Sequence, residues 1–162
     1  MPTRTEHRYT TIPRVLCFLR RGERWLLIRR APDRRLWPNL YNGLGGHVEE
    51  SEGILAAARR EVWEEAGIEA LGLSLCGIIH ADEGGRGVVV FVFTGSAGPG
   101  ELCPSPEGTP GWFTTAEALQ LDLLPDVRLI LPRLLSRQPC DPPFFAQTTL
   151  DATGKPLLAF ES

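Results

Sequence analysis

The segment GHVEESEGILAAARREVWEEAGI, residues 46–68, constrains the fold of this chain more than any other stretch, because an apolar repeat and six glutamates share one short helical pattern. Five apolar residues recur at the spacing of a helix: Ile54, Leu55, Ala58, Val62 and Ala66. Ser51 is a candidate N-cap, because its hydroxyl can accept a hydrogen bond from a free backbone N–H at a helix start. Gly67 supplies a C-terminal stop. The segment therefore predicts one amphipathic helix.

Three glutamates crowd the last turns of this predicted helix. At about 100° per residue, Glu61, Glu64 and Glu65 fall within a sector of roughly 100°, beside the apolar stripe rather than opposite it. They also oppose the helix dipole, whose C-terminal end favours cations. Carboxylate clusters that offer only oxygen ligands suit hard divalent ions such as Mg²⁺. From spacing alone, the cluster indicates either a metal site or an acidic, solvated helix face.

Composition sets the scale of the protein and the kind of partner. With 162 residues, of which 43% are hydrophobic, the chain is expected to fold as a single domain over residues 1–162. A net charge of -3 gives no basic surface for duplex nucleic acid, although local cations can still hold a small anionic substrate. We therefore expect a small-molecule partner, bound by a monomer or a homodimer.

Cysteine usage and the lack of long apolar runs indicate the compartment. The four cysteines contain no CxxC pair, which argues against a zinc site and against a redox dithiol: Cys17, Cys76, Cys103 and Cys140. The N-terminal segment has no apolar signal-peptide core, and no run of about 18 apolar residues occurs. We therefore expect free thiols, no membrane insertion and a cytoplasmic location.

Strand-like segments lie on both sides of the predicted helix, at residues 14–20, 24–30, 71–80, 87–95 and 111–114. The first two form a hairpin, and a loop built from Pro, Gly and Asn follows over residues 31–46. The third and fourth flank a turn at residues 81–86. The fourth carries no charge, which is the pattern of a strand buried on both faces.

The C-terminal part predicts a broken helix and a closing hairpin. A loop rich in Pro and Gly spans residues 96–110, and a helix is expected over residues 115–135, broken near Pro125 and again at Pro132. The tail closes with a hairpin around DATGK, residues 151–155. Strands surrounding one or two helices predict an α/β sandwich, or α+β by some schemes, with a mixed β-sheet.

The acidic segment resembles the Nudix box, Gx5Ex7REUxEExGU, in which U is an aliphatic residue. All nine fixed positions match: Gly46, Glu52, Arg60, Glu61, Val62, Glu64, Glu65, Gly67 and Ile68. Nine specified residues at fixed spacing make a chance match improbable. The segments outside the box are also similar to those of Nudix proteins. The resemblance implies a Nudix-type α/β/α sandwich with a mixed β-sheet over nearly the whole chain.

The resemblance also implies a chemistry. In Nudix hydrolases, divalent cations bridge a substrate diphosphate, and a metal-activated water attacks phosphorus to leave two phosphorylated fragments. Carried over by position, the metal ligands are the carboxylates of Glu61, Glu64 and Glu65 and the backbone carbonyl of Gly45. Arg60 would orient the acids by ion pairing, and Glu52 would support them from the start of the helix. Mg²⁺ is the expected cofactor, with Mn²⁺ as a substitute.

Further candidate residues lie at the edge of the box or outside it. Glu107 precedes a short aromatic strand, where the family often adds a loop carboxylate to the metal site; the alternative is a solvated loop residue. The general base is then either Glu61 or Glu107. Arg29 and Arg30 end the second strand and point to opposite faces, and we favour Arg30 as a ligand of substrate phosphates. Gly46 is expected beside the substrate.

The segment YNGLGGHVE, residues 41–49, resembles the WNGxGGK segment of MutT-like purine nucleoside triphosphatases. In that comparison Asn42 matches an amide that reads the edge of the base, and an amide suits this role because it both donates and accepts. Asp126 lies in an LPD segment that resembles the same subgroup. Leu124 and Val127 stand where the oxidised-purine enzymes carry Trp and a second Asp, so specificity for 8-oxoguanine stays open.

Other Nudix branches match less well. Gly84 replaces the proline usual in the ADP-ribose branch, and Arg86 replaces the tyrosine of dinucleoside polyphosphate hydrolases. We therefore predict a Mg²⁺-dependent pyrophosphohydrolase of nucleoside diphosphate-linked substrates. Nucleoside triphosphates, with oxidised purines such as 8-oxo-dGTP among them, would give the monophosphate and pyrophosphate. The alternative substrate is ADP-ribose or another nucleotide sugar, and the alternative function is a non-catalytic nucleotide-binding sensor or docking module.

Overall fold

The computed structural model describes residues 9–82 and 86–162, in which nine strands and three helices follow one another. The strands are β1 (Thr11–Arg21), β2 (Arg24–Arg30), β3 (Tyr41–Asn42), β4 (Leu44–His47), β5 (Ala70–Asp82), β6 (Gly87–Ala97), β7 (Gly108–Thr114), β8 (Phe144–Leu150) and β9 (Pro156–Phe160). The helices are α1 (Ile54–Ala66), α2 (Thr115–Gln120) and α3 (Pro125–Ser136). Residues 83–85 of the predicted turn, and with them Gly84, lie outside the described residues.

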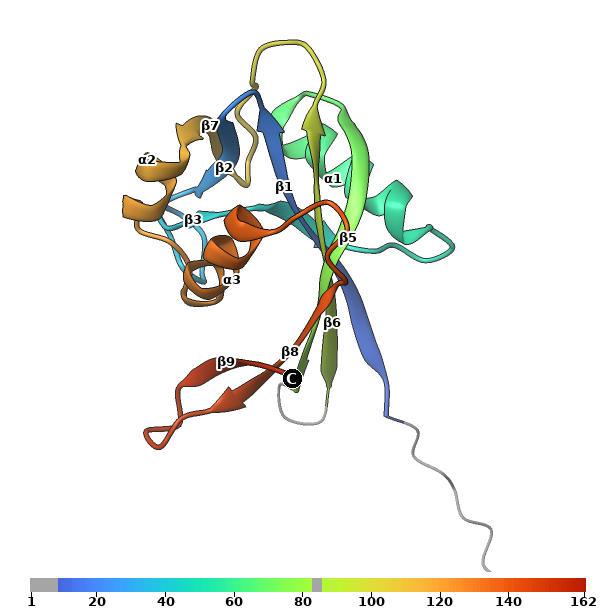
Figure 1. The fold of residues 1–162 in the computed structure, drawn as a ribbon, viewed down its shortest axis with the longest axis vertical. Helices are drawn as coiled ribbons and strands as arrows, with labels where there is room; N and C mark the ends of the chain where they lie inside the picture. The colour runs from blue at the N-terminus through green and yellow to red at the C-terminus, as the bar shows by residue number, and fades with distance from the viewer. Residues whose placement is uncertain (1–8, 83–85) are drawn as a thin grey trace, which may run out of the picture.

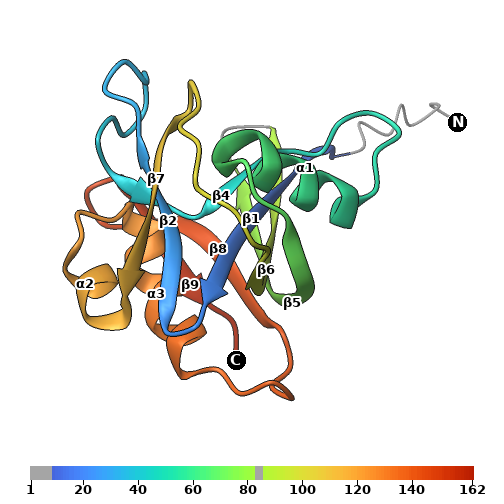
Figure 2. The same cartoon turned by 90° about the horizontal axis from the view of Figure 1, so that it is seen from above.

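The nine strands of the described residues join one mixed sheet. Its main path runs β3-β2-β1-β6-β5-β8-β9, and β4 pairs with β1 while β7 pairs with β2. β1 is parallel to β6 and β5 to β8, whereas the other named pairs are antiparallel. Figures 1 and 2 show α1 on one side of the sheet and α2 and α3 on the other. The α/β sandwich with a mixed sheet is therefore confirmed, and the single domain over residues 1–162 stays a prediction.

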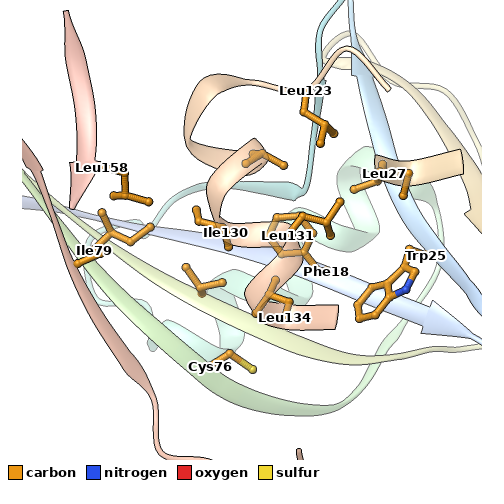
Figure 3. Close-up of a cluster of buried hydrophobic side chains, with 14 residues drawn as sticks. Phe18, Trp25, Leu27, Cys76, Ile79, Leu123, Ile130, Leu131, Leu134 and Leu158 are labelled. Carbon is orange, nitrogen blue, oxygen red and sulfur yellow. The ribbon is translucent and has the colours of Figure 1, made fainter. Parts of the chain in front are cut away.

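The sheet separates two hydrophobic cores, because side chains alternate along its strands. On β1, Cys17 faces α1 and packs in one core with Ala58. Phe18 points to the other side and packs with Leu27 of β2 and Leu131 of α3, as Figure 3 shows. Burial on both faces explains why β1 and β2 contain continuous apolar runs rather than an alternating pattern.

The two predicted hairpins are confirmed, with small changes in their bounds. β2 has the predicted limits, whereas β1 is longer than predicted and spans Thr11–Arg21. β8 pairs with β9 around the predicted turn. There, Oδ1 of Asp151 accepts hydrogen bonds from the backbone N–H groups of Thr153 and Lys155 at 2.8 and 3.0 Å. The side chain of Asp151 therefore stabilises the turn that the composition predicted.

The predicted loop over residues 31–46 is wrong in part, because its second half contains β3 and β4. β3 pairs with β2, and β4 pairs with β1 in the register Leu44 to Cys17. These strands have only two and four residues. Pairing with distant strands, rather than a local preference for extended backbone, explains why they form.

The N-terminal end of α1 differs from the prediction, whereas its C-terminal end agrees with it. Gly53 is the N-cap, and the predicted cap Ser51 has a left-handed φ of 64° instead. Ile54 and Leu55 are 36% and 44% exposed, so the predicted apolar stripe is wrong at its first two positions. Gly67 ends the helix in the left-handed conformation, as predicted, because glycine adopts it without strain.

The predicted C-terminal helix is two helices. α2 begins with a capping box, in which the Thr114 hydroxyl accepts from the Glu117 N–H and the Glu117 carboxylate accepts from the Thr114 N–H. Pro125 is the first residue of α3, where proline fits because its missing N–H has no helical partner. The second predicted break is wrong, since α3 continues through Pro132, an exposed residue.

Two compositional predictions can be compared with the structure. All four cysteines are free; Cys17 and Cys76 are buried, and Cys103 and Cys140 are exposed. Within the part of the chain that is described, no helix has the length and apolar character needed to cross a membrane.

Pro132→Ala is expected to stabilise the protein by about 1–3 kcal/mol, because the new N–H can donate to the Arg128 carbonyl and the exposed site needs no repacking. Pro125→Ala is the matched control at the first helical position, where proline is preorganised, and should destabilise slightly. Denaturant unfolding of both variants measures the two effects. Equal changes in the free energy of unfolding would contradict the different roles of these prolines.

Candidate active site

Two glycines of strand β4, Gly45 and Gly46, are packed so closely that neither position has room for a Cβ atom. A Cβ atom on Gly46 would lie 2.4 Å from Oε1 of Glu61, and one on Gly45 would lie 2.0 Å from the carbonyl oxygen of Val15. The backbone N–H of Gly45 donates to Oε2 of Glu65 at 2.9 Å. Because Gly46 carries no side chain, the Glu61 carboxylate of α1 approaches the backbone of the strand, and the missing side chain of Gly45 lets β1 come close.

Arg60 joins the glutamates of the acidic segment. Its Nε and Nη2 form a bidentate pair with Glu52 at 2.7 and 2.9 Å. Its Nη1 donates to Glu61 at 2.9 Å and to Glu64 at 3.1 Å, and Nη2 also donates to the carbonyl oxygen of His47 at 2.9 Å. Hydrogen bonds from Arg60 lower the pKa of Glu52 to about 2, and the same pairing raises the pKa of Arg60. Arg60 thus contacts three of the glutamates that the sequence groups with it.

Burial perturbs two acids of α1. Among the described residues, Glu65 is the one charged residue that is buried, with 6% of its surface exposed. Burial raises the pKa of Glu65 to about 8, and the charges of Glu61 and Glu107 add to the effect while the Gly45 N–H opposes it. Burial likewise raises the pKa of Glu61, against its hydrogen bond from Arg60. A carboxylate in such surroundings is stabilised by a proton or a cation.

Two predicted residues from other elements join this cluster. Glu107, immediately before β7, raises the pKa of both Glu61 and Glu65 through its charge. Arg30 ends β2 and is partly buried; burial and the charge of Arg34 lower its pKa, whereas the charges of Glu107 and Glu65 raise it. The structure therefore brings Arg30 and Glu107 into electrostatic range of the helix acids.

The alternation of β2 distinguishes the two candidate arginines. Ile28 packs in the core under α1, so Arg30 lies on the same face and Arg29 on the other. The structure also shows a residue that sequence reasoning missed, since Nη1 of Arg34 pairs with Oε1 of Glu107 at 2.9 Å. Arg34 stands beside Arg35 in an irregular loop, where no periodic pattern distinguishes one arginine from the other.

The donor chemistry of the cluster suits a divalent cation such as Mg²⁺, because its side chains offer only carboxylate oxygens: Glu61, Glu64, Glu65 and Glu107. Within residues 9–82 and 86–162, no three His, Cys, Asp or Glu side chains already form a group that holds a metal ion. The acids contact protein groups instead, such as the Arg60 guanidinium for Glu61 and Glu64. The donor set fits the cation, which would have to replace some of these partners.

Asn42 and Asp126, the predicted base-reading residues, lie on neighbouring segments. The backbone of Tyr41 forms two hydrogen bonds with residues 122–124, at 2.8 and 3.0 Å. This pairing brings β3 beside the start of α3. Within the described residues, Oδ1 of Asn42 is buried and has no hydrogen-bond partner. A buried acceptor without a partner is costly, so this atom favours a donor from a ligand or from water.

A cavity of about 320 Å³ lies at the start of α3, with Leu40 and Leu123 among its lining residues. Asp126 is one of its lining residues, and most of its walls are apolar side chains of β9 and of the segments around α3, such as Leu129 and Leu157. Burial raises the pKa of Asp126. The cavity therefore combines apolar surface with one partly desolvated carboxyl group, which is a composition typical of small-molecule sites.

The NUDIX domain model matches residues 10–134 of this chain. The match covers most of the chain. It includes β1, α1 and β7, which carry or support the acidic cluster, and most of α3. The chain therefore belongs to the Nudix hydrolase family.

Two named relatives show which members of the family this chain is similar to. It is 33% identical over 100 residues to the oxidized purine nucleoside triphosphate hydrolase of Mus musculus, and the matched segment covers 60% of this chain and 64% of that protein. It is 46% identical over 44 residues to the m7GpppN-mRNA hydrolase NUDT17 of Bos taurus, which covers 27% of this chain and 15% of that protein. The chain thus matches less than two thirds of the length of either relative.

Solved structures support the fold over most of the chain. A MutT protein from Bacillus halodurans has a TM-score of 0.76 at 23% identity and covers 93% of this chain and 97% of its own. A MutT NUDIX hydrolase from Burkholderia pseudomallei has a TM-score of 0.67 at 25% identity and covers 77% of this chain and 98% of its own. The C-terminal hairpin of β8 and β9 falls outside the family match over residues 10–134 but belongs to the same sheet as the other strands.

The two glycines of β4 are expected to respond differently to alanine. Gly45→Ala would place a methyl group against the Val15 carbonyl, so we expect a loss of about 2–3 kcal/mol in stability. Gly46→Ala meets the flexible end of Glu61, so stability should fall by less than about 1 kcal/mol while the Arg60 to Glu61 contact is lost. Thermal unfolding compares the two variants, and equal destabilisation would contradict this difference.

Proposed function

We propose that this chain is a Mg²⁺-dependent pyrophosphohydrolase that cleaves nucleoside triphosphates to the monophosphate and pyrophosphate. The observation that carries this proposal is the gathering of carboxylates from α1 and from the segment before β7 beside the partly buried Arg30. Acids next to an arginine suit a ligand in which a cation faces the acids and phosphates face both the cation and the guanidinium. Mn²⁺ is expected to substitute for Mg²⁺.

The proposed ligands of the cation are the carboxylates of Glu61, Glu64, Glu65 and Glu107 and the backbone carbonyl of Gly45. When bound, the cation would activate water and stabilise charge on the leaving oxygen. Arg30 would hold substrate phosphates. Gly46, whose missing side chain lets the Glu61 carboxylate approach β4, is proposed to lie beside them. Arg60 and Glu52 would position the acids through their hydrogen bonds.

Glu61 is the proposed general base. Burial raises its pKa, which makes its carboxylate a better proton acceptor near neutral pH than an exposed glutamate. Glu107 is the other candidate, because it comes from a separate segment and acts electrostatically on the same acids. Substituting each residue with glutamine and comparing pH profiles of turnover would distinguish the two.

The proposed base site lies between β3 and the start of α3. Oδ1 of Asn42 would accept from a base donor, and Asp126, which lines the cavity at the start of α3, is the second proposed base contact. The similarity to the mouse oxidized purine nucleoside triphosphate hydrolase supports purine triphosphates as substrates, with oxidised purines such as 8-oxo-dGTP as the first to test. Leu124 and Val127 leave fewer base contacts than the oxidised-purine enzymes have, so ADP-ribose and nucleotide sugars belong in the same panel.

The remaining expectations complete the proposal. The chain would act in the cytoplasm on a small nucleotide, as a single domain over residues 1–162 and as a monomer or homodimer, without duplex nucleic acid as a partner. A non-catalytic nucleotide-binding module is less well supported, because such modules tend to lose acids of the Nudix box and every acid is present here.

Glu64→Gln is expected to lower kcat on the order of 100-fold or more, because it removes the charge of a proposed cation ligand. The side chain of Glu64 is 56% exposed, so the fold should be unaffected. Glu50→Gln, an exposed acid of the same segment, is the matched control and should keep wild-type turnover. Pyrophosphate release from a purine triphosphate with Mg²⁺ measures both variants, and retained turnover in Glu64→Gln would reject the proposed site.

A further inference from the structure

Arg34 lies outside the Nudix box and has no role in the chemistry proposed above, yet it belongs to the same group of charges. Its Nη1 donates to Oε1 of Glu107 at 2.9 Å. It also lies near enough to Arg30 to lower the pKa of that residue. Glu107 in turn acts on Glu61 and Glu65. Arg34 is thus a cation close to both the proposed phosphate ligand and the proposed cation site.

The loop that carries Arg34, residues 31–40, is held by its backbone. Three hydrogen bonds close its ends, at 2.9, 2.9 and 3.1 Å: from Ala31 N–H to the Glu107 carbonyl, from Arg30 N–H to the Leu40 carbonyl and from Asn39 N–H to the Arg30 carbonyl. Figure 2 shows this loop in light blue beside the yellow segment that leads into β7. These bonds do not use the side chains of Arg34 or Glu107. The loop can therefore keep its place when the side-chain pair separates.

The pair itself is weak enough to exchange partners. The side chains of Arg34 and Glu107 are 38% and 43% exposed, and a pair at this exposure contributes at most about 1 kcal/mol. A phosphate chain carries more charge than one carboxylate, and a guanidinium binds it through two parallel hydrogen bonds. Glu107 also gains a stronger partner if a divalent cation binds to it. Both residues therefore have better partners in a complex with substrate than they have in the free protein.

We propose that Arg34 is a ligand of the substrate phosphates, held close to the site by Glu107 until substrate binds. Arg34 would then contact the phosphate chain together with Arg30, from the side of the loop. This inference rests on the proposed function, because it adds a residue to the same site. It concerns the phosphate end of the substrate and is independent of which base is bound.

Binding of inorganic pyrophosphate in buffer free of divalent metal separates this role from a structural one. Arg34→Gln is expected to weaken binding about 10-fold, because a charge-assisted hydrogen bond is lost. Glu107→Gln is expected to strengthen binding, because it frees Arg34 and removes a negative charge. Arg35→Gln, the exposed neighbour in the same loop, is the matched control and should bind as the wild type does. Calorimetry gives the affinities, and thermal unfolding checks that each variant is folded.

Opposite effects of Arg34→Gln and Glu107→Gln are the result that supports the proposal. If the pair only tethers the loop, both variants break the same contact and weaken binding alike, which would overturn it. A loss in Arg34→Gln no larger than in Arg35→Gln, or a wild type that binds no pyrophosphate, would also overturn it. None of these results removes the proposed function, which fails instead if the wild type hydrolyses no nucleotide with Mg²⁺ or Mn²⁺.

Discussion

The Gly45 N–H donates to the buried carboxylate of Glu65. This hydrogen bond joins α1 to β4 at the one charged side chain that is buried among the described residues. A buried carboxylate is costly unless a donor, a proton or a cation accompanies it. The helix can approach so closely because Gly46 of β4 has no side chain on the side of Glu61 and because α1 contributes small residues, such as Ala58, to the core below. Arg60 then offsets the repulsion among the remaining glutamates. The close approach of α1 to β4 therefore determines both the packing of the helix and the position of the carboxylates in the proposed chemistry.

The two faces of the sheet carry different parts of the proposed substrate site. The acids of α1 and the side chain of Arg30 lie on one face, whereas α3 and the cavity next to Asp126 belong to the other. β3 connects them, because it pairs with β2 and its Tyr41 backbone also binds the segment before α3. A nucleotide whose phosphates lie near the acids and whose base contacts Asn42 would lie along β3. The same short strand that sequence reasoning took for a loop thus lies at the centre of the proposed substrate site.

Features that depend on the spacing of residues within one helix or strand could be predicted from the sequence. The interior of α1, its glycine stop, the β1 to β2 hairpin and the placement of Arg29 and Arg30 on opposite faces follow from helical spacing or strand alternation. The Nudix box indicated the family, which the domain match over residues 10–134 shows. The roles of the individual site residues stay predictions.

Features set by distant contacts could not be predicted. β3 and β4 are too short to show a period and exist because β2 and β1 pair with them. Ser51 has the chemistry of an N-cap, but its left-handed backbone moves the helix start to Gly53. Arg34 meets Glu107 across 73 residues of sequence, between two irregular segments. For the two strands and for Arg34, the deciding interaction joins parts of the chain that no local pattern relates.

The most direct test is to identify the products formed from purine triphosphates, 8-oxo-dGTP, ADP-ribose and dinucleoside polyphosphates, with Mg²⁺ and after its removal by a chelator. A divalent-cation site at the end of α1 predicts monophosphate and pyrophosphate from a triphosphate, in amounts that fall to background when the cation is removed. Cleavage that persists without any divalent cation, or release of single phosphate groups in place of pyrophosphate, would contradict it.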